Sequence, residues 1–306
     1  ARSQRAHPIV PGVVYFVYDR VHHVVVDLQE PGIVLQNIVP QRGERGTLFT
    51  PSCCVAPDAL VITDADYHGL DGSNKADGRE VFFHQGRAAL FVREGRYDIG
   101  VIRTKEEYEP VTTSWGGGPI FIWDGEYNFN PFDEWFQPKV LEYYRTSPWA
   151  KMTAAVSEDR KYLVLSASYG LVLEEHAENV IALGRLWGIK IDRALRFDGA
   201  ESAYLGLRLG PHFVSVLDIT PEPKIVNCLV IRRSGDWKVE RRLYGRFFVG
   251  EGRCFARPNF SAESLIESTC GDCRTGRVYF NSGASYLPES SSEVSNRHLG
   301  TFGPRF

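Results

Sequence analysis

Short segments rich in Val, Ile, Tyr and Phe recur along most of the chain, and turn-forming residues separate them. β-branched and aromatic residues between clusters of Gly, Asp and Asn are typical of strands. The pattern predicts strands at residues 13–18, 21–28, 87–93, 99–103, 119–123, 162–167, 213–219 and 225–232. Strands are therefore expected to dominate the fold.

Two segments carry a helical pattern instead. Ala177, Val180, Ile181, Gly184 and Trp187 recur at a spacing near 3.6, which predicts a helix at 174–187 that the next glycine can end. Apolar residues recur in the same way at 132–145, despite a proline inside that range. Because helices are few, we predict an α+β fold in which a mixed, mostly antiparallel sheet has helices packed on one side.

The strand predicted after the first of these helices leads to candidate chemistry. Apolar residues alternate with Arg196 there, and Asp198 and Gly199 then predict a turn that presents Asp198, Glu201 and Ser202 together. A carboxylate pair beside a hydroxyl at a strand end suits a catalytic site. A polar surface turn, in which the aspartate bonds its own backbone, explains the same residues, and both interpretations stay open.

Asp64 and Asp66 stand two positions apart in an extended segment, so their side chains are expected on one face. Such a pair serves as a general acid and base, or binds calcium or magnesium together with Asp198. A solvated strand face is the alternative. His68 shares the same parity and could move protons near neutral pH.

A glycine run before Pro119 and two arginines are candidates for contacts with an anion. Gly117 and Gly118 lack a Cβ, so they let the backbone approach a ligand and leave amide hydrogens open to it, unless the run is only a flexible turn. Arg87 and Arg103 are candidate phosphate partners, although single arginines more often lie on the solvated surface.

Seven segments occur in the order in which similar segments occur in the phosphodiester glycosidase family, and together they span about residues 10–233. They are residues 24–31, 61–68, 87–95, 117–125, 152–159, 194–204 and 225–231. Residues 194–204 resemble the family's Leu-Asp-Gly-Gly-Gly-Ser signature, and 152–159 its Arg-Thr-Ala-Ile-Gly segment. The resemblance implies a family-like domain at 1–233, followed by an extension at 234–306 that contains a cysteine cluster.

The same resemblance implies a hydrolase that cleaves a glycosidic bond to a phosphodiester or a related sugar linkage, acting on a carbohydrate or sugar-phosphate substrate. Asp198 is then the first choice for the essential carboxylate, with Asp64, Asp66 and Glu201 beside it. The implied substrate contacts include Thr153 and Ser202, together with the histidine, glycines and arginines named above.

Two departures from the family pattern bear on activity. Ala200 and Glu201 stand where the family has glycines, and Met152 stands where it has arginine. These changes predict a site that is more acidic and less cationic than usual, unless a metal or another arginine compensates. Two other functions therefore stay open: a catalytically silent relative that binds carbohydrate or a protein, and a different enzyme on the same scaffold.

Composition narrows the choice further. The net charge of −3 and the pI of about 6.3 give no broad attraction to nucleic acid. No apolar run reaches the roughly 20 residues that span a bilayer. The family resemblance suggests a secreted or extracytoplasmic protein. Of the six cysteines, Cys254, Cys270 and Cys273 fall short of a zinc ribbon, so disulfides are favoured over structural zinc, with their pairing left open.

Overall fold

The structure is a computed structural model that describes residues 6–39, 48–67, 71–210, 212–217 and 222–234. Its largest sheet has the spatial order β1-β2-β3-β14-β13-β15-β11-β12. These strands are β1 (Ala6–Val10), β2 (Val13–Tyr18), β3 (Val21–Asp27), β14 (Tyr162–Ser168), β13 (Lys151–Ser157), β15 (Ile191–Gly199), β11 (Ile120–Trp123) and β12 (Glu126–Tyr127).

Two smaller sheets complete the architecture. One has the order β7-β6-β10-β8-β9, and the other has the order β17-β16-β5-β18-β4. The strands of the first are β7 (Arg79–Phe82), β6 (Asn74–Ala76), β10 (Val111–Gly116), β8 (Arg87–Arg93) and β9 (Arg96–Ile102). Those of the second are β17 (His212–Ser215), β16 (Leu205–Leu209), β5 (Ala59–Asp64), β18 (Cys228–Arg233) and β4 (Ile33–Ile38).

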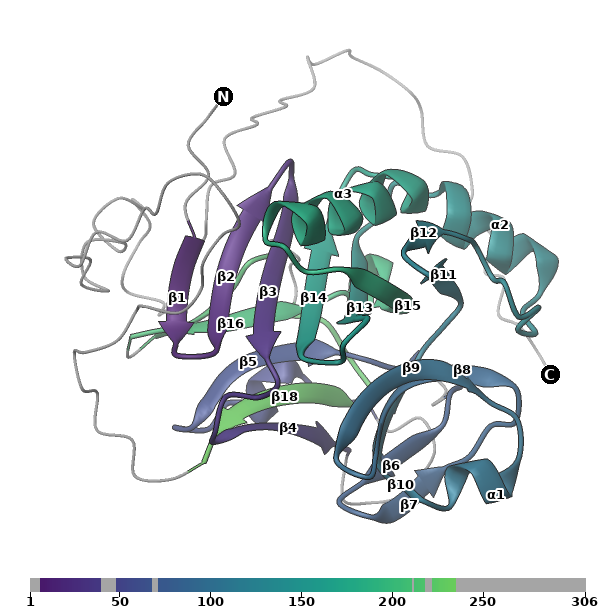
Figure 1. Cartoon of the computed structure of the whole chain (residues 1–306), viewed down its shortest axis with the longest axis horizontal. Helices are drawn as coiled ribbons and strands as arrows, with labels where there is room; N and C mark the ends of the chain where they lie inside the picture. The colour runs from purple at the N-terminus through teal and green to yellow at the C-terminus, as the bar shows by residue number, and fades with distance from the viewer. Residues whose placement is uncertain (1–5, 40–47, 68–70, 211, 218–221, 235–306) are drawn as a thin grey trace, which may run out of the picture.

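The helix α3 (Leu173–Leu186) lies across one face of the largest sheet (Figure 1). Ala177, Val180 and Leu183 pack there against buried strand residues such as Val25 and Val164. The opposite face of that sheet contributes to a second core, which also contains residues of the other two sheets. Its members include Val24, Met152, Leu195, Leu90, Trp115, Leu205 and Leu229. The sheet is thus covered on both faces, and its strand ends remain as the places where a site can form.

The α+β prediction is confirmed, and every strand pairing in the described residues is antiparallel. The predicted helix at 174–187 corresponds to α3. The one predicted at 132–145 is shorter, because α2 (Pro138–Thr146) begins at the proline, whose fixed φ and missing N–H suit a first helical position. A third helix, α1 (Lys105–Tyr108), and the short 3-10 helices η1 (Pro51–Cys54) and η2 (Ala200–Ser202) complete the elements.

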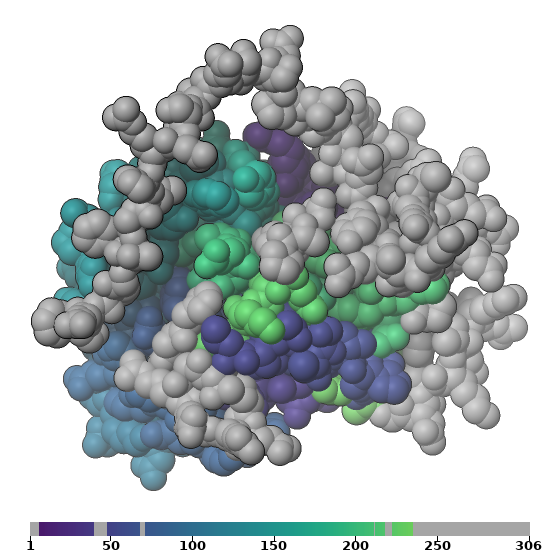
Figure 2. Space-filling view, turned by 180° about the vertical axis from the view of Figure 1, so that it is seen from behind, coloured from purple at the N-terminus to yellow at the C-terminus, as the bar shows by residue number. Residues whose placement is uncertain are grey.

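A disulfide joins Cys54, at the end of η1, to Cys228 in β18. Phe49 pairs with Ile225 beside it, and indigo residues of the η1 region meet light green residues near the end of the described chain in Figure 2. Cys53 is a free, exposed thiol. The cysteines at 254, 270 and 273, and the extension predicted from residue 234, lie outside the described residues except for Ser234. In the described part of the chain, no helix is long and apolar enough to cross a membrane.

Candidate functional site

The end of β15 lies against the segment that follows β5, although the two strands belong to different sheets. The backbone N–H of Asp198 donates to the carbonyl oxygen of Ala65 over 2.9 Å. Because Ala65 stands between Asp64 and Asp66, the backbone of this pair lies beside that of Asp198, which is far from it in sequence. Asp198 itself is half-buried. This hydrogen bond brings together the two backbone segments that carry the predicted carboxylates.

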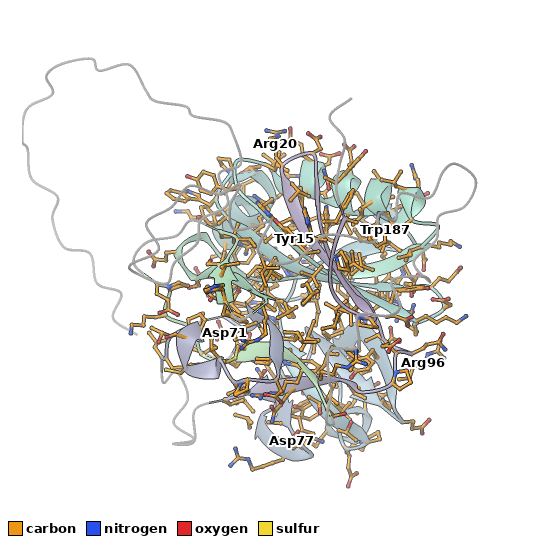
Figure 3. The ribbon with its side chains drawn as sticks, turned by 90° about the vertical axis from the view of Figure 1, so that its left-hand side faces the viewer. Tyr15, Arg20, Asp71, Asp77, Arg96 and Trp187 are labelled. Atoms are coloured by element: carbon orange, nitrogen blue, oxygen red, sulfur yellow. A yellow bond between two sulfur atoms is a disulfide. The ribbon has the colours of Figure 1, made fainter. Side chains whose placement is uncertain are left out.

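The site occupies one end of the largest sheet. Lys151 pairs with Gly199 of β15 on one side and with Ser168 of β14 on the other, and Ser168 in turn pairs with Val21. Figure 3 marks this end by Arg20, which lies in the turn before Val21. Neighbouring strand ends thus surround the turn that contains Asp198.

Asp64 is fully buried. Its Oδ1 accepts a hydrogen bond of 2.7 Å from the backbone N–H of Tyr204, whereas its Oδ2 is buried without a partner. Burial raises the pKa of Asp64 well above its ordinary value, and the negative charge of Asp198 raises it further. Asp64 therefore keeps its proton into a pH range in which an ordinary aspartate is ionised.

Asp66 performs a structural task that the sequence did not suggest. Its carboxylate accepts hydrogen bonds from the backbone N–H of Tyr67 and of Gly72, and from the side-chain amide of Asn74. Burial raises its pKa to about 7, although these donors and the charge of Arg87 favour the carboxylate. Asp66 thus fixes the loop after β5, and its oxygens are already engaged.

Arg196 enters the site from β15, two residues before Asp198. Its side chain is buried, with 3% exposed, and its guanidinium carbon lies 4.0 Å from the centre of the Tyr144 ring. Its Nη1 donates to the hydroxyl of Tyr67 over 3.3 Å, and its Nε has no partner. The hydroxyl of Tyr67 donates onward to the carbonyl oxygen of Gly118. A fixed positive charge therefore stands beside Asp198, held by aromatic rings.

Arg87 brings a second buried guanidinium to the same aromatic cluster. It is 4% exposed, and its guanidinium carbon lies 3.8 Å from the centre of the Phe136 ring and 5.9 Å from that of Tyr67. Its Nε and Nη2 have no hydrogen-bond partner. Tyr67 also lies 5.9 Å from the Arg196 guanidinium carbon, and stacks on Tyr144 with ring centres 5.4 Å apart. Both arginines thus border Tyr67, with N–H groups unsatisfied.

These two arginines change the expected charge of the site. Met152, where the family pattern has arginine, is fully buried in the core shared with the other sheets. Arg196 of the neighbouring strand supplies the charge instead. Arg196 and Arg87 are thus candidates for the compensating arginine that the sequence analysis left open. The alternation of Arg196 with apolar residues in a predicted strand was the one available signal.

The glycine run packs within the protein. The N–H of Gly117 donates to the carbonyl oxygen of Ala88 over 3.1 Å, and that of Gly118 to the carbonyl oxygen of Arg196 over 2.7 Å. A Cβ on Gly117 would come within 2.7 Å of that Arg196 oxygen, and one on Gly118 within 2.4 Å of Glu134 Oε2. The expected open amides are thus engaged, and small residues are needed here because chains pass closely.

Glu134 was not among the predicted residues, yet it organises this corner. Its two carboxylate oxygens accept hydrogen bonds of 2.8 Å, one from the N–H of Ala88 and one from that of Ile120. It is 3% exposed, and burial raises its pKa despite these donors. Glu134 ties the segment before α2, which contains Phe136, to β8 and β11.

The remaining predicted residues are dispersed. Thr153 is buried under α3, where its hydroxyl bonds Nε2 of His176 over 2.9 Å. Ser202 is buried, whereas Glu201 is exposed. Arg103 is exposed in another hollow, over the ring of Phe132. His68 lies outside the described residues.

The predicted divalent cation finds little support in this arrangement. Among the residues that the structure describes, no group of three or more His, Cys, Asp or Glu side chains is placed to hold a metal ion. The oxygens of Asp66 already accept N–H groups, and one oxygen of Asp64 accepts the N–H of Tyr204. Asp64 Oδ2 has no hydrogen-bond partner, so the divalent cation stays a prediction.

No family model and no curated protein matches the sequence. Among solved structures, the fold is similar to the catalytic domain of zebrafish N-acetylglucosamine-1-phosphodiester alpha-N-acetylglucosaminidase, described as auto-inhibited by its pro-peptide. The TM-score is 0.54 at 14% identity, covering 76% of this chain and 82% of that one. A hypothetical protein from Synechocystis matches with a TM-score of 0.51 at 13% identity, covering 76% of this chain and 61% of that one. At such identities the likeness shows a shared fold alone.

Proposed function

We propose that this protein is a hydrolase that cleaves the glycosidic bond between a sugar and a phosphodiester. The observation that carries the proposal is the pair of buried guanidinium groups that border Tyr67, Arg87 and Arg196, of which Arg196 stands two residues before Asp198. Unpaired N–H groups on a buried cation are costly to fold, and phosphate oxygens are strong hydrogen-bond acceptors for a guanidinium group. The fold shared with a sugar-phosphodiester hydrolase supports the same substrate class.

The chemistry follows from the charges in the site. Water attacks the anomeric carbon, Asp198 accepts the water's proton, and the carbon–oxygen bond to phosphate breaks. The bonding electron pair leaves on the phosphate oxygen, where Arg196 stabilises the charge. Burial raises the pKa of Asp64, which favours its neutral form and lessens the negative charge beside Asp198. Asp198 thus assists the attack of water and Arg196 the departure of the phosphate, and the two residues stand two positions apart on β15.

A panel of aryl and alkyl sugar 1-phosphodiesters tests the proposal, with released phosphomonoester as the readout. Asp198→Asn should lower turnover by roughly 10²–10⁴-fold, the range for loss of a general base. Asp124→Asn is the matched control, because Asp124 is exposed in a turn where its φ of 54° suits asparagine equally well. Turnover that survives Asp198→Asn in a folded protein would refute the assignment.

Carbohydrate binding without turnover is the second candidate function. It is favoured by the depth of Arg196, which the ring of Tyr144 covers. In that case the panel would show binding of sugar phosphodiesters by calorimetry with no release of product. We also propose an extracytoplasmic location, since the Cys54–Cys228 disulfide suits an oxidising compartment. Mass spectrometry of protein from its native compartment, with and without reduction, tests that bond.

A further inference from the structure

Two exposed aromatic rings stand at the same end of the largest sheet as Asp198. Trp149 is 53% exposed and Tyr169 is 63% exposed, and their ring centres lie 6.4 Å apart with planes at 84°. Aromatic side chains this large are usually covered in a folded domain, and exposed ones commonly mark contact surfaces. These two therefore form a small apolar platform, which we define as the Trp149–Tyr169 pair.

Strand pairing places the platform beside the candidate catalytic turn. Trp149 precedes β13 by two residues, and Tyr169 directly follows β14. The intervening Ala150 accepts a hydrogen bond of 2.8 Å from the N–H of Ala200, and Lys151 pairs with Gly199. The order along this edge of the sheet is therefore Tyr169 after the end of β14, Trp149 before the start of β13, and then Arg196 and Asp198 on β15.

The segments that carry the two rings are fastened to one another. Nζ of Lys151 donates to the carbonyl oxygens of Ser147 and Trp149 over 2.7 and 3.0 Å, and also to that of Leu171. The N–H of Gly170 donates to the carbonyl oxygen of Pro148 over 2.8 Å. Little conformational freedom is left for the backbone on either side of the rings, so an occupant would meet a prepared surface.

The size and chemistry of the platform select its occupant. A stable protein interface buries about 800 Å² on each partner, which far exceeds what two rings can cover. One sugar ring matches them, because the C–H groups of a pyranose pack on an aromatic face while its hydroxyl groups stay in water. The aromatic rings and the nearby catalytic carboxylate together favour a carbohydrate.

We propose that the Trp149–Tyr169 pair is the sugar subsite of this protein and that Arg196 holds the phosphate, so that the scissile bond lies over Asp198 between them. This assignment rests on the proposed function for the position of the phosphate. It predicts that the two halves of the substrate bind to different side chains. The sugar contacts the two rings that flank β13 and β14, and the phosphate contacts Arg196 on β15.

The test uses neutral methyl glycosides of glucose, galactose, mannose and N-acetylglucosamine, with dimethyl phosphate as the charged half. Ligand-observed NMR titrations of the full chain should show binding of at least one glycoside. Trp149→Ala and Tyr169→Ala should each weaken it by roughly tenfold, which corresponds to about 1.4 kcal/mol, and leave dimethyl phosphate unaffected. Arg196→Lys should weaken the binding of dimethyl phosphate and leave glycoside binding unaffected, because lysine lacks the planar fork of donors.

Two further variants separate ring stacking from loss of structure. Trp149→Phe keeps an aromatic face and should restore most of the glycoside affinity. Leu186→Ala removes an exposed apolar side chain at the far end of α3 and should change nothing. Unchanged thermal midpoints confirm that each variant folds.

The outcomes distinguish the two proposals. If glycoside binding survives both alanine substitutions, or if the wild-type protein binds none of the four glycosides, the subsite assignment is overturned. Turnover that Asp198→Asn abolishes would then still stand as the function. If the platform binds a glycoside as expected and no sugar phosphodiester is hydrolysed, the catalytic proposal fails while the sugar contact of the two rings is supported.

Discussion

The two ends of β15 carry the same two residue types in very different surroundings. At its start, Asp192 and Arg193 belong to an ion-pair network. Arg193 Nη1 lies 3.1 Å from Asp98 Oδ1, and Arg160 Nη1 lies 2.7 Å from Asp192 Oδ2. Each charge there has an opposite charge within contact, so the network supports the structure without help from a ligand.

At its end, the guanidinium group of Arg196 lies over the ring of Tyr144, and its Nη1 donates to the hydroxyl of Tyr67. Arg196 is more deeply buried than Arg193, although each guanidinium group lies over an aromatic ring, Tyr144 for Arg196 and Trp123 for Arg193. The difference is that Arg193 Nε lies 3.2 Å from Asp192 Oδ2, whereas Arg196 Nε is buried without a hydrogen-bond partner. Natural chains retain groups that cost folding free energy mainly where function needs them. One end of the strand therefore carries arginines paired with carboxylates, and the other carries a buried arginine with an unpaired Nε, which is the better candidate for binding a ligand.

The largest difference between the two ends is expected when one arginine at each end is replaced by methionine. Arg196→Met should lower turnover of a sugar phosphodiester by roughly 10²–10³-fold, the range for removal of a group that stabilises developing charge. Its stability should stay equal or rise, because a buried charge with unpaired donors is removed.

Arg193→Met should do the opposite, with turnover within about twofold and stability lower by about 1 kcal/mol through loss of its ion pairs. Chemical denaturation and steady-state kinetics on both variants provide the measurements. A larger activity loss in Arg193→Met than in Arg196→Met would reverse the roles assigned to the two ends.

The pH dependence of stability tests the protonation of Asp64. The folded-state pKa of Asp64 is raised, so its contribution to stability is complete below the unfolded pKa near 3.8 and is lost as pH rises toward the folded pKa. Asp64→Asn keeps an oxygen for the N–H of Tyr204 and cannot titrate. The fall in unfolding free energy above pH 4 should therefore be shallower in this variant.

Asp77→Asn is the control for that measurement, since Asp77 is exposed and its φ of 48° suits asparagine as well. Denaturation midpoints between pH 4 and pH 8 give the three curves. Parallel curves for the wild type and Asp64→Asn would show that Asp64 is ionised in the folded protein, and the assignment of a single negative charge beside Arg196 would have to be withdrawn.

Much of the fold could be predicted from the local sequence pattern, because buried strands are rich in β-branched and aromatic residues. The predicted strands at 13–18 and 87–93 coincide with β2 and β8, and Gly188 follows α3 as expected. The helix expected from 132 failed at its start, since the apolar spacing there reflects packing of Phe136 against Tyr67 and not a helical face.

The candidate site was readable only in part. Asp198 was predicted from the turn that follows its strand, and Asp64 from its extended segment; each lies at the end of its strand, β15 or β5. Arg196 was missed as a functional residue, because its depth depends on Tyr144 and Tyr67, which come from distant segments. The amides of Gly117 and Gly118 were misjudged for the same reason, since their acceptors are on β8 and β15. Local sequence does not record such tertiary contacts.

A glycine pair tests whether the site depends on close chain packing. Gly118→Ala would place a Cβ 2.4 Å from Glu134 Oε2 at a φ of +111°, whereas Gly95 has a φ of +71° and nothing within 4 Å of its Cβ position. We expect Gly118→Ala to cost roughly 2–3 kcal/mol of unfolding free energy, from overpacking added to backbone strain.

Gly95→Ala should cost only the backbone term, about 1 kcal/mol. Urea denaturation of both variants gives the difference. Equal costs would mean that Glu134 gives way easily, and that the corner holding Arg87 is less rigid than its hydrogen bonds indicate.

The smallest effect is expected at Arg103, which the sequence analysis named with Arg87 as a candidate phosphate partner. It lies in a hollow with Arg93, Arg193, Trp123 and Phe132, so aromatic rings and arginines occur there too. The difference is compensation, because Asp98 pairs with Arg193 and the carbonyl oxygen of Glu107 accepts a hydrogen bond from Arg93. Arg103→Ala should therefore change stability by less than about 0.5 kcal/mol and leave turnover unaltered. A marked rise in KM for sugar phosphodiesters in Arg103→Ala would indicate that the phosphate binds in this hollow. The assignment of phosphate binding to Arg196 at the end of β15 would then be wrong.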